Sequence, residues 1–183
     1  HGEKTNVATY AFIDEGSSAT FVDRKLIEEL GVEGTLNPVC LKWTDDTTRN
    51  ESESLEVNLQ ISSVHRGAKV YDLRNVHTLR ELMLPTQTLP IQELVTLYPH
   101  MKGLPIDSYT NVVPRILIGV NNIHLGKPLR CVEGKFDEPI AAKTRLGWTV
   151  FGPCRVPAHS CKLLNDHYTS GCNRKDSART SNG

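Results

Sequence analysis

The chain has 183 residues, of which 38% are hydrophobic and 23% charged, and this is enough for one domain with a buried core. Lysine plus arginine and aspartate plus glutamate balance at 21 each, so we expect neither nucleic acid nor an anionic membrane among the partners. No apolar run reaches the length of a membrane span, and the first residues lack the apolar stretch of a signal peptide.

The first part of the chain predicts short strands and one helix. Residues 6–13, rich in β-branched and aromatic side chains, predict a buried strand that runs into a turn at residues 14–18. Residues 19–22 predict a second strand. Asp23 is a suitable N-cap for a helix over residues 24–30.

Further strands are predicted up to residue 76. Residues 39–43 predict a strand that ends in the polar run 44–53, and residues 55–61 alternate as a half-buried strand does. Residues 64–67 are typical of a hairpin turn, with residues 68–76 as the return strand.

Between residues 82 and 114 the pattern changes, because five prolines divide it into short pieces. We expect an irregular insertion without a sheet, holding one helix over residues 91–97. Residues 115–119 then predict a short apolar strand, and residues 121–125 a helical turn.

The last predicted strands are residues 129–133 and 149–151. After Pro153 the composition becomes polar and loses its periodicity, which predicts a domain over residues 1–153 and a largely disordered linker over 154–183. The sequence starts without methionine, and we expect it to be a piece of a longer polypeptide.

Two segments carry candidate chemistry. Asp14 directly follows an apolar strand and precedes Gly16, so the acid is held at a strand end with little bulk behind it. By turn preferences alone, an Asp-x-Gly is an ordinary turn by about ten to one. The second segment, about a hundred residues later, is the apolar strand Ile116, Leu117 and Ile118, which ends at Gly119. By itself it is a plain buried strand.

Together with two further segments, these resemble the protease region of BEL/Pao-type retrotransposon polyproteins. Residues 14–18, 98–105, 114–125 and 144–152 occur in the same order, and Thr-Arg-Leu-Gly-Trp within the last of them is the most specific part. The resemblance covers residues 6–153, about four-fifths of the chain. It implies an all-β fold, a retropepsin-like closed barrel of short strands with one or two short helices and an irregular proline-rich insertion.

The resemblance also implies an aspartic endopeptidase that processes a retrotransposon polyprotein. A second Asp-Thr/Ser-Gly is missing, since Asp107-Ser108 lacks the glycine, so the second acid must come from another copy of the chain. Two adjacent aspartates share one proton. The charged one activates water, and the protonated one hydrogen-bonds the peptide carbonyl.

In this interpretation Asp14 is catalytic, and the active loop is shaped or supported by Glu15, Gly16, Ser17, Ile116, Leu117, Ile118 and Gly119. The implied partners are a second copy of the chain and a peptide or polyprotein substrate, with no cofactor and no metal. The implied location is the cytoplasm, including retrotransposon particles.

Retroviral-type proteases close a hairpin flap over the substrate. The candidate here is residues 41–57, with Asp45, Asp46, Thr47 and Thr48 at its tip. A plain solvated hairpin is an equal alternative, because lid loops and other loops share composition. The tip also carries no glycine, in contrast to the usual flap.

Glu15 supports a different function for the same fold. The best-known members have threonine or serine there, and the hydroxyl braces the two active loops. An ionised glutamate cannot donate that bond, and in a dimer it adds negative charge that opposes ionisation of the aspartates. The alternative is a catalytically weak or inert dimer that acts as a peptide-binding or assembly module.

The five cysteines are an odd number, which favours reduced thiols in a cytoplasmic protein. A zinc site is an alternative for Cys154, His159, Cys161, His167 and Cys172. Their spacings fit neither a zinc knuckle nor a zinc finger. The interpretation that these residues bind no metal is therefore favoured by about five to one. The aromatic residues Trp43, Trp148 and Phe151 are expected in the core or in a sheet shared by the dimer.

Overall fold

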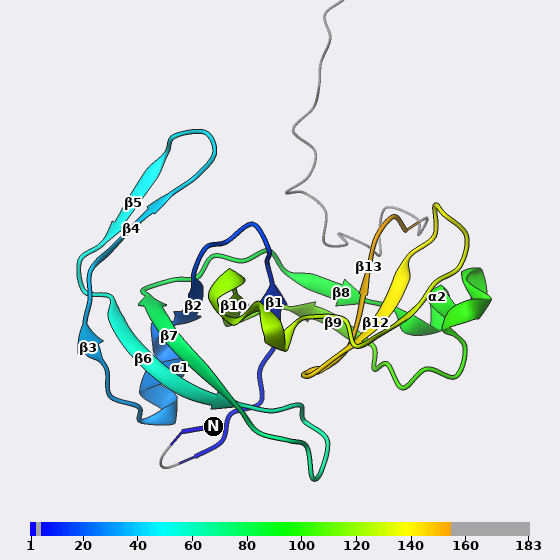
Figure 1. The fold of residues 1–183 in the computed structure, drawn as a ribbon, viewed down its shortest axis with the longest axis horizontal. Helices are drawn as coiled ribbons and strands as arrows, with labels where there is room; N and C mark the ends of the chain where they lie inside the picture. Colours follow the sequence, from blue (N-terminus) through cyan, green and yellow to red (C-terminus); the bar gives the residue numbers. More distant parts are fainter. Residues whose placement is uncertain (3–4, 155–183) are drawn as a thin grey trace, which may run out of the picture.

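The computed structural model describes residues 1–2 and 5–154 of the chain (Figure 1). In this part the fold consists mostly of β-strands with a few short helices, so the all-β prediction is confirmed. No helix within these ranges combines the length and the apolar character that crossing a membrane requires.

The main sheet of the described chain has six strands in the order β1-β10-β2-β7-β6-β3. Their bounds are β1 (Ala11–Ile13), β10 (Ile116–Ile118), β2 (Thr20–Asp23), β7 (Tyr71–Leu79), β6 (Leu55–Ile61) and β3 (Thr35–Leu36). β10 pairs in parallel with β1 and antiparallel with β2. A strand from far along the chain therefore separates the two strands that flank Asp14.

The predicted closed barrel is wrong for the described residues, because this sheet stays open between β1 and β3. Closure requires the two edge strands to hydrogen-bond to each other. Here the edge strands β1 and β3 have three and two residues, whereas β7 inside the sheet has nine. The edge strands therefore offer few backbone groups for pairing. The remaining strands form small separate sheets instead.

These smaller sheets consist of neighbouring segments. Their strands are β4 (Val39–Lys42) with β5 (Thr48–Glu51), β8 (Gln87–Leu89) with β9 (Tyr109–Val112), and β11 (Arg130–Val132), β12 (Ile140–Thr144) and β13 (Gly147–Phe151) together. The β8–β9 pair contradicts the prediction of an insertion without a sheet. The pair was missed because both strands are short and largely polar, so no alternation marks them.

Both predicted helices are confirmed at their predicted bounds. In α1 (Arg24–Leu30) the side chain of Asp23 accepts from the N–H of Lys25 at 3.0 Å, and Gly31 ends the helix at φ 66°. α2 (Ile91–Leu97) lies inside the insertion. Short 3₁₀ helices follow at η1 (Pro99–Met101) and η2 (Val120–Leu125).

Two predicted strands have boundaries that are wrong by three residues or more. The first begins at Ala11, not at residue 6, because its partner β10 has only three residues to offer. The return strand of the hairpin runs from Tyr71 to Leu79, not over 68–76, because its end pairs with Asp23 of β2. In both cases the partner strand sets the boundary.

The described residues form two hydrophobic clusters. The first lies between α1 and the main sheet and includes Val22, Leu26, Leu30, Leu73, Val76 and Ile118. The second joins the insertion to the C-terminal sheet and includes Leu89, Ile91, Leu94, Tyr98, Met101, Ala141 and Val150. The insertion is therefore part of a core. The predicted linker, from residue 155 onward, lies outside the described residues.

Candidate functional site

Asp14 lies at the end of β1, where the chain leaves the main sheet. Its backbone N–H donates to the carbonyl oxygen of Ile118 at 3.0 Å, which continues the register that pairs Ile13 with Ile118. Asp14 is half-buried, whereas Glu15 and Gly16 are exposed. The structure therefore joins the candidate acid to the predicted supporting strand and leaves it accessible from one side.

The loop after Asp14 is braced by its own hydrogen bonds. The Gly16 N–H donates to Asp14 Oδ1 at 2.8 Å, and the Ser17 N–H donates to the Asp14 carbonyl oxygen at 3.3 Å. Ser17 Oγ donates to the carbonyl oxygen of Ala19 at 2.8 Å. A backbone amide thus orients one carboxylate oxygen of Asp14 in advance of any ligand.

β10 ends so close to this loop that only glycine fits at position 119. A Cβ on Gly119 would lie 2.1 Å from the carbonyl oxygen of Ala19 and 2.8 Å from that of Ser17. Its φ of −89° suits any residue, so space and not backbone conformation requires the glycine. The next residue, Val120, donates its N–H to the Ser17 carbonyl at 2.8 Å, which ties the two segments together.

A buried polar network lies behind the loop and joins β2, η2 and β7. Thr20 is fully buried, and its Oγ1 accepts from the Gly119 N–H at 3.2 Å and from Asn122 Nδ2 at 3.0 Å. The same hydroxyl donates to Asn121 Oδ1 at 2.6 Å. Asn122 also forms two hydrogen bonds with the backbone of Arg74, at 2.8 and 3.1 Å. Sequence reasoning missed Thr20 and Asn122, whose only signal is a polar residue in an apolar segment.

The β4–β5 hairpin overlaps the predicted flap over residues 41–57, but it ends at Glu51, its strand β5 lies in the predicted polar run, and residues 55–57 belong to β6. The turn of the hairpin contains Asp45, Asp46 and Thr47, and Thr48 is the first residue of β5. Trp43 and Thr47 close the turn, with the Trp43 N–H donating to the Thr47 carbonyl at 3.0 Å. The hydroxyl and the backbone N–H of Thr47 both donate to the Asp45 carboxylate. These hydrogen bonds lower the pKa of Asp45, and the one from the hydroxyl has the larger effect.

This hairpin projects away from the main sheet (Figure 1). Among the described residues, no hydrogen bond or ion pair connects residues 45–48 to the Asp14 loop. The structure therefore brings residues 14–17 together with residues 116–119. It leaves the four predicted tip residues apart from them.

For the three aromatic residues the structure tests the core alternative but not the shared sheet of a dimer. Trp43 is 46% exposed at the hairpin turn and Phe151 is 40% exposed at the end of β13, so neither belongs to a core of the described chain. Trp148 packs against the second hydrophobic cluster. The prediction of a core position holds for Trp148 alone among the three.

A cavity of about 680 Å³ lies beside the N-terminal segment but not at Asp14. Its lining includes Tyr10, Ile13, Ile116, Leu146 and Trp148, whereas Asp14 is absent from the lining. The candidate acid is therefore not part of this cavity.

The metal alternative is only partly covered by the structure. Residues 1–2 and 5–154 contain no group of three or more His, Cys, Asp or Glu side chains placed to hold a metal. Cys40 and Cys131 are free thiols there. The other candidate ligands, His159, Cys161, His167 and Cys172, lie outside the described residues.

Comparisons with known proteins assign no family to this chain. No protein-family model matches it, and searches of curated proteins and of solved structures found no significant match. A functional conclusion therefore depends on the geometry around Asp14 and on the order of the sequence segments.

Proposed function

We propose that this chain is the protease domain of a BEL/Pao-type retrotransposon polyprotein, with a retropepsin-like fold. It acts as a homodimeric aspartic endopeptidase, and each copy contributes Asp14 to one shared active site. The substrate is a peptide segment of a polyprotein. The order of four sequence segments and the arrangement of β1, β10 and β2 support this proposal.

One observation carries the proposal: β10 lies between the two strands that flank Asp14. Two strands joined by a short turn can pair with each other as a hairpin, whereas here β10 is inserted between β1 and β2. Here Gly119 allows β10 to contact the loop backbone, and Thr20 satisfies the buried N–H of Gly119. An acid held so firmly at a strand end is preorganised for chemistry.

The chemistry follows from two such loops facing each other across a two-fold axis. Two aspartates at short distance hold one proton between them, because both cannot carry a charge. The charged carboxylate takes a proton from water, which attacks the peptide carbonyl carbon, and the protonated one donates to the carbonyl oxygen. The Gly16 amide holds Asp14 Oδ1 in a fixed direction throughout.

Glu15 favours a second candidate, an inert dimer of the same fold that binds peptides or serves assembly. Its side chain is exposed beside Asp14, and two copies would add two negative charges around the shared site. These charges oppose the single ionisation that water activation requires. Replacing Glu15 separates the candidates, since Glu15→Thr increases cleavage if the glutamate merely weakens an active enzyme.

The decisive experiment compares Asp14→Asn with the wild-type chain on a peptide library. We expect wild-type cleavage that a pepstatin-like inhibitor blocks, and a loss of about a thousandfold or more in Asp14→Asn, because the amide cannot act as the base. Folding should be retained, since the amide oxygen still accepts from the Gly16 N–H.

The matched control is Asp107→Asn, the same change at an exposed acid that precedes serine but lacks the following glycine. Its cleavage rate should equal that of the wild type. Equal rates in Asp14→Asn and the wild type would overturn the protease proposal. If the wild type and Asp14→Asn both bind peptides and neither cleaves them, the inert peptide-binding dimer would be supported instead.

A further inference from the structure

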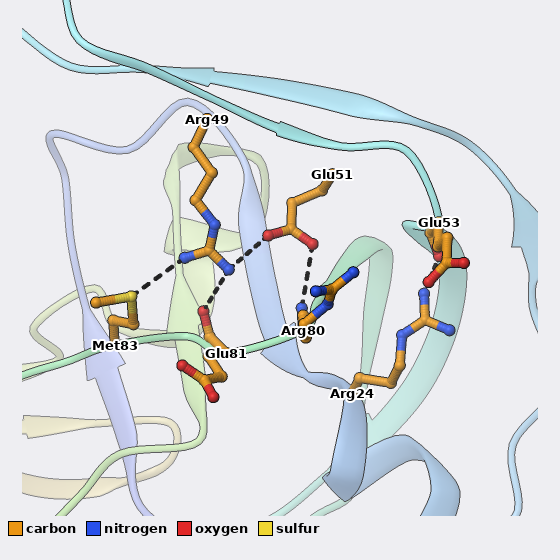
Figure 2. A network of polar contacts seen from close by, with 7 residues as sticks. All are labelled: Arg24, Arg49, Glu51, Glu53, Arg80, Glu81 and Met83. Atoms are coloured by element: carbon orange, nitrogen blue, oxygen red, sulfur yellow. Dashed lines mark hydrogen bonds and ion pairs between the residues drawn. The ribbon is translucent and has the colours of Figure 1, made fainter.

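The β4–β5 hairpin is attached to the rest of the molecule through one side of β5. Arg49 Nη2 donates to the carbonyl oxygen of Glu81 at 3.0 Å, and Arg49 Nη1 donates to Met83 Sδ at 3.4 Å (Figure 2). Glu81 and Met83 belong to the connection that follows β7. Because Arg49 pairs with Leu41 halfway along the hairpin, it holds the middle of the hairpin to this connection.

Glu51 completes the attachment at the base of the hairpin. Its Oε1 lies 2.5 Å from Arg49 Nη2, and its Oε2 accepts from the backbone N–H of Arg80 at 3.3 Å. Figure 2 shows these contacts beside Arg24, which donates to the Glu53 carbonyl just beyond the hairpin. The base is thus bonded both to the end of β7 and to the start of α1.

Burial distinguishes this ion pair from the Lys42–Asp46 pair on the same hairpin. The side chains of Arg49 and Glu51 are 27% and 11% exposed, whereas those of Lys42 and Asp46 near the turn are 65% and 84% exposed. Exposed pairs contribute little, but a shielded pair with further hydrogen bonds is costly to break. The hairpin is therefore restrained at its base and middle, while its turn carries only weak contacts.

We propose that Arg49 is a positioning residue, which sets how far the β4–β5 hairpin can move and thereby how it meets a bound peptide. This inference rests on the proposed function, because it assigns the hairpin the role of a flap. Arg49 does not touch the reacting atoms. It acts by keeping the hairpin in the conformation that binds substrate, with the exposed Trp43 at the moving end.

The restraint has a measurable consequence for binding. If loss of the Arg49 contacts lets the hairpin leave its binding position for part of the time, the apparent affinity is the intrinsic affinity multiplied by the fraction of molecules that remain competent. The catalytic step is unaffected once the peptide and hairpin are in place. Arg49→Gln should therefore raise KM about tenfold and leave kcat within about twofold, since hydrogen bonds to a charged group are among the stronger ones.

The experiment measures hydrogen exchange and substrate kinetics in the same full-length variants. Arg49→Gln should increase the exchange rates of amides in residues 39–51 by about tenfold, and Met83→Leu should change them little, because a thioether is a weak acceptor. Arg66→Gln is the matched control, since Arg66 is exposed in the β6–β7 connection and forms no ion pair among the described residues. Its exchange rates should equal those of the wild type.

Trp43 gives an independent measure of hairpin motion. In a Trp148→Phe background Trp43 is the single tryptophan, and its fluorescence anisotropy should fall in Arg49→Gln but not in Arg66→Gln. Unchanged exchange and anisotropy in Arg49→Gln would overturn the restraint. Faster exchange with an unchanged KM would overturn its role in substrate binding.

These outcomes are separable from failure of the proposed function. A wild-type chain that cleaves no peptide would remove the protease assignment and, with it, the kinetic part of the inference. The exchange and anisotropy measurements need no catalysis, so they still decide whether Arg49 restrains the hairpin.

Discussion

At the scale of single residues, Thr20 links the candidate site to the core. Its hydroxyl serves two donors, the Gly119 backbone and the Asn122 side chain, within a space closed to water. A buried N–H that loses its acceptor costs the full desolvation penalty of that group. Thr20 therefore holds β10 in contact with the Asp14 loop, although it touches no reacting atom.

Thr20→Val tests this role, because valine keeps the shape and removes the oxygen. We expect the free energy of unfolding to fall by about 2–4 kcal/mol, since two buried donors lose an acceptor. Urea unfolding monitored by circular dichroism measures the change. Thr110→Val is the control, a threonine that is exposed on β9, and it should change the free energy of unfolding by less than about 0.5 kcal/mol. A similar loss in both variants would show that the hydroxyl network has no special weight.

At the scale of elements, α1 is tied to the chain just before β10. Arg115 donates to both carboxylate oxygens of Glu29 at 3.0 and 2.9 Å, and it lies 3.7 Å from Asp23, the N-cap of the helix. The hydrogen bond to Arg115 is the main cause of the lowered pKa of Glu29, and the same bond raises the pKa of Arg115. The bidentate geometry fixes the orientation of α1 relative to the strand that supports Asp14.

This pair predicts a pH dependence of stability. Because the pKa of Glu29 lies below its ordinary value of 4.5 in the folded chain, the pair stabilises the fold above pH 4.5 and this contribution is lost as the pH falls through the lowered pKa. Glu29→Gln should therefore be less stable than the wild type at neutral pH, and the difference should vanish in acid. The expected difference is small, since Glu29 is exposed.

Carboxyl NMR titration of Glu29 and urea unfolding at several pH values measure both quantities. Glu28→Gln is the matched control, because Glu28 is exposed on the same helix turn and has no ion pair among the described residues. A stability difference in Glu29→Gln that persists below the measured pKa would contradict the assignment to this pair.

At the scale of the whole molecule, the described chain carries one Asp14 loop, and the proposed chemistry needs two. The main sheet is open at β1, next to that loop, and the second hydrophobic cluster lies toward the C-terminal sheet. An isologous dimer places the same residues of both copies at the axis. One chain is therefore half of the proposed active site.

Mixing predicts how activity depends on the second copy. An excess of about ninefold of Asp14→Asn over wild type should lower wild-type cleavage about tenfold, because most wild-type chains then pair with a partner that lacks the second acid. The same excess of Asp107→Asn should not lower it. The chains are first mixed at a concentration at which dimers dissociate, so that partners exchange. Cleavage rates are then measured once dimers have formed again. An unchanged wild-type rate with excess Asp14→Asn would mean that one chain works alone.

The sequence by itself determined the features that depend on neighbours within a few residues. The helix at residues 24–30 follows from capping and apolar spacing, and the helix at residues 91–97 from apolar spacing; the strand at residues 39–42 follows from its apolar composition, but its partner β5 was not predicted. The order of segments also predicted that Asp14 and Ile118 belong to one site, and their backbones are hydrogen-bonded.

Only the tertiary structure decided which strands pair and where they end. The strands β8, β9 and β12 pair with neighbouring segments, but they are short and were not predicted from their own sequence. The insertion of β10 between β1 and β2, which leaves β1 at the open edge, depends on a partner about a hundred residues along the chain, which local periodicity does not identify. The roles of Thr20 and Arg49 were hidden for the same reason. A hydroxyl or guanidinium acquires its function from the groups that folding brings around it, here the Gly119 amide and the Glu81 carbonyl.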